Sequence, residues 1–309
     1  EELGMELPTD LDVFTAFLQA AKVQYDIAPL TANKSSPFIS TILTAFGMGD
    51  AEWYDIDGTY THRIKHPQIA DYLAYLQKLY SEGLMDNDMP INTADNSKEK
   101  FASGNAIACA PLMFWDIPSM VNALSTSNPD CKIEFVTDLA PDADTQPHHY
   151  IMEGAKFVTC ISQNSKNPEH VVNWLNILTE PDNFRRTYIG EEGVSYEIID
   201  GEYHPIFEGD DATNFNAYTN SDKLSGFSAP TPAFQMWQAR ARKTPEMAEA
   251  YEAMNSRVDE YEALVSIEAY GKTSPQVQEY ITALNQAFSD SFLKAIVEGT
   301  DPDEAVAAM

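Results

Sequence analysis

The stretch EKFASGNAIACAPLMFWDIP, Glu99–Pro118, decides the fold. Its first half predicts a short helix that stops at a glycine turn, and the small apolar residues after Asn105 predict a short buried strand. Phe114 and Trp115 then follow at the junction between this strand and the next helix. In open α/β sheets, ligand clefts form where strands hand over to helices. The largest side chains of the stretch therefore stand where a cleft is expected.

The surrounding sequence predicts a helix-rich α/β order. Helical periodicity predicts helices within 8–22, 35–47, 65–83, 166–193, 244–265 and 274–299, and Thr9 is the expected cap of the first. Two Asp-Gly pairs predict tight hairpins within 53–64 and 194–207. Further strands are predicted at 132–141 and 154–162, and the rest of the chain after Pro230 is expected to be almost entirely helical. Strands separated by helices indicate a mixed α/β fold.

Size and charge limit the function. With 309 residues the chain is long enough for two lobes, and the polar run Phe207–Gly226 is the best candidate for a linker or long surface loop. The 48 acidic and 19 basic residues give a net charge of −29, which argues against nucleic acid as a partner. No apolar run reaches the roughly 20 residues that a membrane helix needs. The three cysteines, Cys109, Cys131 and Cys160, are expected to be buried and unpaired.

Motifs of enzymes and metal sites are largely absent. The sequence has no nucleophile elbow and no zinc-protease motif. The run DNDMPINTADNS from Asp86 fails as a calcium loop, because Ile91 stands where the sharp turn needs glycine. His148 and His149 lie near Asp142 and Asp144, but we expect a solvated loop there, with metal binding as the lesser alternative. No metal and no cofactor is therefore predicted.

Aromatic side chains carry the strongest functional signal. Phe38, Trp53, Phe114, Trp115 and Trp237 follow prolines or stand at the ends of predicted elements. A flat ring packed on the apolar face of a sugar buries surface without needing charge. Alternatively, each is an ordinary core residue. This interpretation is stronger for Phe38 and Trp53 than for Trp115. Trp174, inside a helical pattern, is expected in the core.

Several segments follow one another in a recognisable order: LPTDLDVFTAFLQAAK, SPFISTILTAFG, WYDIDGTY, IADYLAYLQKLYSEGLMD, EKFASGNAIACAPLMFWDIP and NPEHVVNWLNILTEPDNFRRTYIGEEG. This order resembles the extracellular solute-binding proteins of carbohydrate ABC transporters (family 1). FSAPTPAFQMW and the long helical tail are most similar to the lipoprotein branch of that family. The resemblance covers most of the chain from Leu7 onward.

The resemblance implies a periplasmic-binding-protein-like (type II) fold with two α/β lobes that clamp a sugar. It implies that 1–158 form the main part of the second lobe, that 159–210 belong to the first lobe, and that 211–309 return to the second. The family normally begins with a longer stretch, so an N-terminally truncated fold that binds sugar weakly is expected. An apolar face of Val171, Leu175, Leu178 and Phe184 would then lack its sheet. A calcium loop that relatives often carry is not matched here.

On this resemblance, Trp115 and Trp237 are the expected stacking residues, with Phe114, Trp53 and Phe38 as lesser candidates. Asp116 is expected to orient sugar hydroxyls. The implied function is the non-enzymatic, substrate-binding component of an ABC importer, which captures a neutral oligosaccharide and delivers it to membrane permease subunits. A monomer is expected, extracellular and held at the cell surface as a lipoprotein in its full-length form.

Two other functions stay open at this point. The many carboxylates would also allow a secreted carbohydrate-active hydrolase, in which two of them act as a pair. The tail from Thr244 to Met309 would suit a helical interaction module. A hydrolase predicts turnover of a chromogenic glycoside, and an interaction module predicts that no sugar shifts the melting temperature.

Overall fold

The computed structural model describes residues 3–34, 37–49, 51–110, 114–152, 160–206, 232–242, 244–256, 262–266 and 275–309. The chain divides into two compact units. Unit 1 combines Glu1–Gly154 with Ser256–Met309, and unit 2 is Ala155–Asn255. The expected lobe boundaries stood at 158 and 210, and the expected linker Phe207–Gly226 lies outside the described residues. The assignment of the units to lobes of a family fold stays a prediction.

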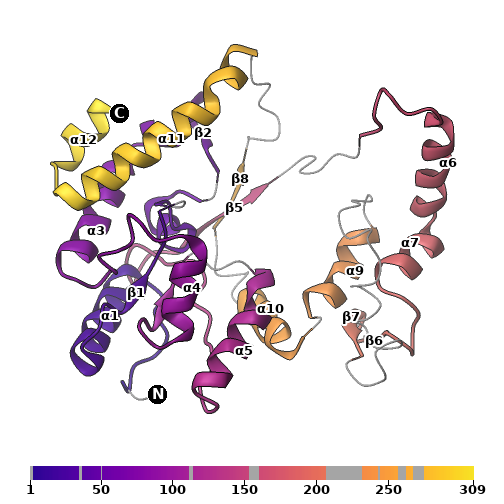
Figure 1. The fold of residues 1–309 in the computed structure, drawn as a ribbon, viewed down its shortest axis with the longest axis horizontal. Coiled ribbons are helices and arrows are strands. Elements are labelled where there is room, and N and C mark those ends of the chain that lie inside the picture. Colours follow the sequence, from indigo (N-terminus) through magenta and orange to yellow (C-terminus); the bar gives the residue numbers. More distant parts are fainter. Residues whose placement is uncertain are drawn as a thin grey trace. The chain divides into compact units, whose positions relative to one another are not determined.

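Unit 1 is built from helices around short parallel and antiparallel strand pairs (Figure 1). Its helices are α1 (Leu11–Tyr25), α2 (Ser40–Leu43), α3 (Ile69–Ser81), α4 (Ala94–Ala102), α5 (Ile117–Ser127), α11 (Pro275–Glu298) and α12 (Pro302–Ala308), with the 3-10 turns η1 (Thr44–Phe46), η2 (Arg63–Lys65) and η3 (Phe114–Asp116). Its strands are β1 (Leu30–Thr31), β2 (Trp53–Ile56), β3 (Thr59–His62), β4 (Ala108–Cys109), β5 (His148–Met152) and β8 (Glu262–Ser266).

Helix α3 forms the centre of the unit 1 core. Apolar residues recur at helical spacing, so Tyr72, Leu73 and Leu76 fall on one face and are fully buried. Figure 1 shows α11 and α12 packed beside this helix, and Phe292 of α11 stacks on the Tyr72 ring with 5.9 Å between centroids. The Tyr72 hydroxyl donates to the Pro37 carbonyl at 2.8 Å, which satisfies the polar end of the buried ring.

Parallel pairing joins parts of unit 1 that are distant in sequence. Leu30 of β1 pairs with Ala108 of β4, and Met85 forms a further parallel bridge to Leu30. β5 pairs in parallel with β8, which ties 148–152 to 262–266. The expectation that the tail is almost entirely helical was therefore wrong at β8: the predicted helix 244–265 ends at Asn255, and the following segment pairs as a strand. Only the distant partner β5 supplies the hydrogen bonds that make it one.

Other local expectations were also corrected. Helix α1 is capped by Asp10, whose carboxylate accepts from the Val13 amide at 2.8 Å, and not by Thr9. The predicted strand at 132–141 has no ladder, since only Ala140 forms an isolated bridge, to Asp10. Most of the predicted strand at 154–162 lies outside the described residues. The expected loop at His148 is instead the start of β5.

The cysteines differ in burial from one another. Cys109 is half-buried in β4, whereas Cys131 and Cys160 are exposed, so the expectation that all three are buried was wrong for these two. Each lacks the strand environment that the sequence suggested, because no described ladder includes either residue.

Both predicted hairpins are confirmed. β2 and β3 pair antiparallel around Asp57 and Gly58, which have φ angles of +51° and +77°. In unit 2, Asp200 and Gly201 turn in the same way, with φ of +52° and +87°. Asp and Gly tolerate this left-handed region at low cost, which is why the pair marks a tight turn.

Unit 2 has a small core. Its described elements are α6 (Pro168–Thr179), α7 (Pro181–Tyr188), β6 (Tyr196–Ile199), β7 (Glu202–Pro205), α9 (Pro232–Ala241) and α10 (Pro245–Asn255). The core cluster contains Phe184, Ile189, Tyr196, Met236 and Ala239. The nearly buried Arg242 guanidinium joins β7 to α10 through Glu202 at 2.6 Å and Glu252 at 2.8 Å.

The apolar face expected to lack its sheet is the more buried face of helix α6. Leu178 and Phe184 are buried and Val171 and Leu175 are half-buried, so the expected open face is largely covered. Trp174 is instead 50% exposed, which corrects its expected place in the core. The neighbouring α7 packs against α6, whereas Val172, Trp174 and Ile177 of α6 stay exposed.

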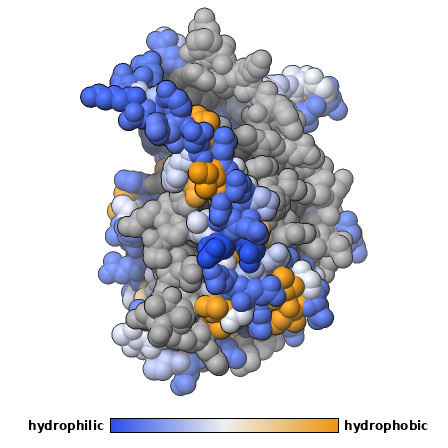
Figure 2. Space-filling view, turned by 90° about the vertical axis from the view of Figure 1, so that its right-hand side faces the viewer, coloured by the Kyte–Doolittle hydropathy of each residue, from blue (hydrophilic) through white to orange (hydrophobic). Residues whose placement is uncertain are grey.

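The described surface is mostly hydrophilic. In the face that Figure 2 shows, apolar side chains stand in small separate patches among polar ones. A net charge of −29 spread over such a surface favours solubility and repels polyanions. Every helix within the described ranges is too short or too polar to cross a bilayer.

Candidate functional site

The candidate site lies at the carboxyl edge of the parallel strands of unit 1. Met85, β1 and β4 run side by side in the same direction, so the residues that follow them reach one edge of the sheet. Asp86 follows Met85, and Asn33 comes soon after β1. The turn η3, with Phe114, Trp115 and Asp116, comes after β4. Ligand sites of open α/β sheets lie outside this kind of edge.

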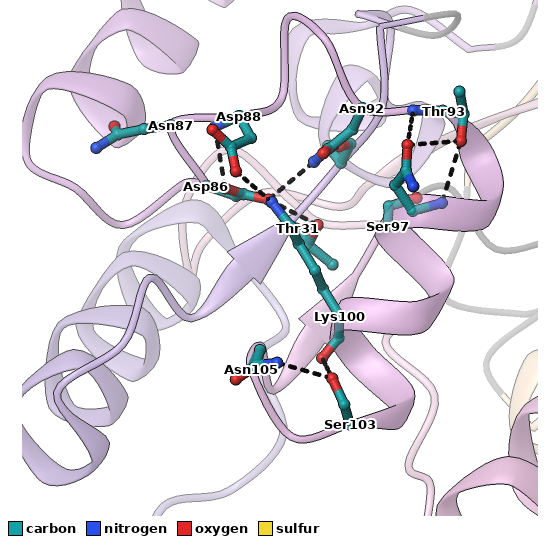
Figure 3. A network of polar contacts seen from close by, with 12 residues as sticks. Thr31, Asp86, Asn87, Asp88, Asn92, Thr93, Ser97, Lys100, Ser103 and Asn105 are labelled. Atoms are coloured by element: carbon teal, nitrogen blue, oxygen red, sulfur yellow. Dashed lines mark hydrogen bonds and ion pairs between the residues drawn. The ribbon is translucent and has the colours of Figure 1, made fainter.

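A polar network fills the first part of the edge (Figure 3). The Asp86 carboxylate accepts hydrogen bonds from the Lys100 ammonium at 2.6 Å, the Asn92 amide at 2.8 Å and the Thr31 hydroxyl at 3.2 Å. Asp88 binds the same ammonium at 2.9 Å. Burial by itself would raise the pKa of Asp86, but these hydrogen bonds outweigh it and hold the pKa below its usual range. Both carboxylates therefore bind the same lysine ammonium.

This network positions helix α4. Thr93 and Asn96 form a capping box that starts the helix, and Lys100 ties its later turn to the loop after Met85. The same helix carries Lys98, whose ammonium lies 2.9 Å from Asp116 Oδ1. Lys98 is 24% exposed and Asp116 18%, so solvent still reaches this ion pair. α4 thus places a lysine against the carboxylate of η3.

Phe114, Trp115 and Asp116 lie close together because they are consecutive residues of η3. Phe114 is half-buried, Asp116 pairs with Lys98, and the Trp115 side chain lies outside the described part of the structure. Behind them, burial raises the pKa of the Cys109 thiol to about 11, although a hydrogen bond with Ser97 opposes this. The Cys109 thiol therefore keeps its proton at neutral pH.

Trp53 belongs to a second aromatic group on the β2–β3 hairpin. Its ring stacks on Tyr60 with 4.7 Å between centroids and 2° between planes, and His62 meets it edge-on at 4.9 Å. His62 in turn contacts Phe288 of α11 at 5.4 Å. Sequence reasoning missed Tyr60 and His62, although the alternation of the hairpin places both on the Trp53 side. Figure 1 shows β2 beside α11, well apart from α4 and α5.

Phe38 and Trp237 lie elsewhere. Phe38 packs against Phe292 at 5.0 Å and against Tyr72 at 6.4 Å, and the Arg63 guanidinium lies 4.0 Å above its ring. These contacts give Phe38 a packing role and add nothing to its prediction as a ligand-binding residue. Trp237 stands in α9 of unit 2, and its side chain lies outside the described residues.

The described residues contain no cluster of three or more histidine, cysteine or carboxylate side chains suited to a metal ion. His148, one of the residues weighed as a ligand, belongs to β5. Its expected neighbours Asp142 and Asp144 lie in an exposed turn, where Asp142 accepts from the Thr145 hydroxyl at 2.7 Å.

Comparison with known proteins gives one clear sequence relative. A protein of Niallia circulans, known as the uncharacterized protein in the butB 5′ region, is 31% identical over 240 residues, which cover 75% of this chain and 88% of the relative. No family model matches the chain.

Solved structures show the same fold at low identity. The calcium-free alginate-binding protein AlgQ2 aligns with 99% of this chain at a TM-score of 0.63 and 16% identity. An extracellular solute-binding protein from Bifidobacterium longum subsp. infantis aligns with 99% of this chain at a TM-score of 0.61 and 15% identity. An HMO-binding, ABC-transporter-associated solute-binding protein from Bifidobacterium longum infantis aligns with 99% of this chain at a TM-score of 0.57 and 18% identity. The chain spans only 65%, 66% and 66% of these three structures. It is therefore a helix-rich α/β chain that matches about two thirds of a periplasmic-binding-protein-like fold.

Proposed function

This chain belongs to the same family as the uncharacterized protein in the butB 5′ region of Niallia circulans, and we propose that it is the sugar-capturing part of an ABC importer. The observation that carries the proposal is the alignment of 99% of the chain with solute-binding proteins, among them an alginate-binding and an HMO-binding one. Those structural neighbours are binding proteins, so we propose capture and delivery without catalysis.

In this proposal the ligand is a neutral oligosaccharide that binds at the carboxyl edge of β1 and β4. Trp115 stacks on a sugar ring at this edge and Phe114 contributes a lesser contact, and Trp237 is the second proposed stacking residue. One oxygen of Asp116 is held by Lys98 at 2.9 Å, and the other oxygen accepts a sugar hydroxyl. Ring stacking supplies affinity for the apolar face of the sugar, and the fixed carboxylate supplies orientation.

The wider assignments of the full protein are part of the same proposal. They are capture between two lobes, delivery to permease subunits in the membrane, and an extracellular place at the cell surface, in line with the named extracellular relative. Lobe closure around the ligand would be the signal that the permease reads.

A glycan panel tests the proposal. Differential scanning fluorimetry followed by calorimetry should find at least one neutral oligosaccharide that stabilises the chain. Trp115→Ala and Trp237→Ala should each weaken its binding about tenfold, because each removes a stacked ring. Trp174→Ala is the matched control, since it removes an equally large but exposed ring from α6 and should leave affinity unchanged.

Two results would contradict the proposal: no sugar of the panel binds, or both Trp variants bind as the parent does. Turnover of a chromogenic glycoside by the parent chain would instead favour the hydrolase.

A further inference from the structure

The ion pair between Lys98 and Asp116 is the charged feature of the site that involves the turn η3. The two atoms lie 2.9 Å apart, and both side chains stay partly open to solvent. Asp116 is also the residue directly after Phe114 and Trp115 in η3. Within the described part of the chain, Asp116 is the only carboxylate within salt-bridge distance of the Lys98 ammonium.

The other lysines near this edge are placed differently. Lys100 is held by two carboxylates, Asp86 at 2.6 Å and Asp88 at 2.9 Å, so its charge is more than balanced. Lys34, which follows β1, is exposed, and water screens its charge. Of these three lysines, Lys98 is therefore the one whose charge is balanced by a single carboxylate. That carboxylate, Asp116, belongs to η3, the proposed ligand-binding turn.

We propose that Asp116 decides which charge of sugar the edge accepts: paired with Lys98 it presents a neutral site that excludes uronates, and without its carboxylate the same site takes them. This rests on the proposed function, since it concerns the ligand of that site. A uronate that approached Lys98 would bring a second anion to an ammonium already neutralised at hydrogen-bond distance. Like charges at such close range repel, whereas an uncharged hydroxyl meets no such barrier.

Removing the carboxylate reverses this balance. Asp116→Asn leaves the partly buried Lys98 ammonium without its charged partner, so a ligand carboxylate can then pair with that ammonium. A hydrogen bond between charged groups in a partly desolvated place is among the stronger polar contacts, which predicts a gain of about tenfold or more in affinity.

The test compares two trisaccharides with the same linkage: α-1,4-trigalacturonate, which has a carboxylate at C6 of each ring, and α-1,4-galactotriose, which has a neutral hydroxymethyl group there. Calorimetry at pH 7 and low salt should show Asp116→Asn binding trigalacturonate at least about tenfold more tightly than the parent, with no such gain for galactotriose. The double variant Lys98→Gln with Asp116→Asn should lose that gain, because it removes the ammonium as well.

Glu298→Gln is the charge-matched control. It removes one carboxylate from a lysine ion pair, that of Lys294 on α11, and changes the net charge equally, but α11 is not part of the candidate edge. It should bind trigalacturonate as the parent does. If Asp116→Asn does not fold, Asp116→Ser carries the same expectation.

The inference is overturned if Asp116→Asn gains no more affinity for trigalacturonate than Glu298→Gln, or if the double variant keeps the gain. Failure of the proposed function looks different, since then the parent chain binds no sugar of the wider glycan panel.

Discussion

At the scale of single residues, His66 is a clear source of pH dependence. Its side chain is only 8% exposed, its ring meets Tyr54 edge-on at 5.1 Å, and Nδ1 accepts from the Gln68 amide at 3.2 Å. Burial lowers the pKa of His66 from 6.5 to about 4. The folded state thus favours the neutral ring, and the unfolded state binds the proton first as the pH falls.

Acid should therefore destabilise the protein through this residue. The contribution is fully present above about pH 6.5 and is lost as the pH falls toward 4, by up to about 3 kcal/mol in total. His66→Asn keeps an acceptor near the Gln68 amide but removes the titration, so its free energy of unfolding should change less over this range. Urea unfolding at several pH values measures the difference.

His170→Asn is the control for this prediction, because His170 is exposed on α6. It should follow the parent curve. Parallel curves for the parent and His66→Asn would show that His66 is not protonated on unfolding in this range.

At the scale of elements, the ion pair between Lys100 and Asp86 anchors helix α4 to the loop after Met85. Asp86→Asn should lower the free energy of unfolding by about 2 kcal/mol at pH 7, because four donors lose a charged acceptor. Asp88→Asn should cost under about 1 kcal/mol, since Asp88 is 61% exposed. Equal losses in chemical denaturation would mean that α4 is not anchored mainly through Asp86.

Because the Asp86 pKa is lowered on folding, the stabilisation is present above about pH 4 and is lost as the pH falls through the folded pKa.

The β2–β3 turn offers a second test at this scale. Gly58 has a φ of +77°, and a Cβ added there would meet no atom within 4 Å. Gly58→Ala should therefore cost about 1 kcal/mol through backbone conformation alone. Asp57→Gly, at a φ of +51°, should be nearly neutral. A neutral Gly58→Ala in thermal unfolding would contradict the turn geometry.

At the scale of the whole molecule, the small core of unit 2 is the sensitive part. Phe184 is 4% exposed within that core and stacks on Tyr188 at 4.9 Å. Phe184→Ala should destabilise unit 2 by about 3 to 5 kcal/mol, whereas Trp174→Ala, on the exposed side of α6, should cost far less. Hydrogen exchange resolves the two units: protection should fall in 160–206 for the first variant and stay unchanged in α3. Equal effects of the two variants would contradict the observed packing.

How much of the candidate site the sequence predicted also depends on scale. Phe114, Trp115 and Asp116 share η3 because they are neighbours in the chain, so the strand-to-helix pattern was enough to group them. Lys98 was missed, because its pairing with Asp116 depends on how α4 packs beside η3. Tyr60 and His62 were missed although the hairpin itself was predicted, since the ring stacking is a cross-strand contact.

The sequence by itself determined the local elements of this protein: the α3 periodicity, the two Asp-Gly hairpins, and the strand and turn around β4, because each depends on residues within a few positions of one another. Only the tertiary structure decided the pairing of β5 with β8, the exposure of Trp174 and the partner of Asp116. Those features depend on contacts between segments far apart in the chain, and no local pattern records which segments will meet.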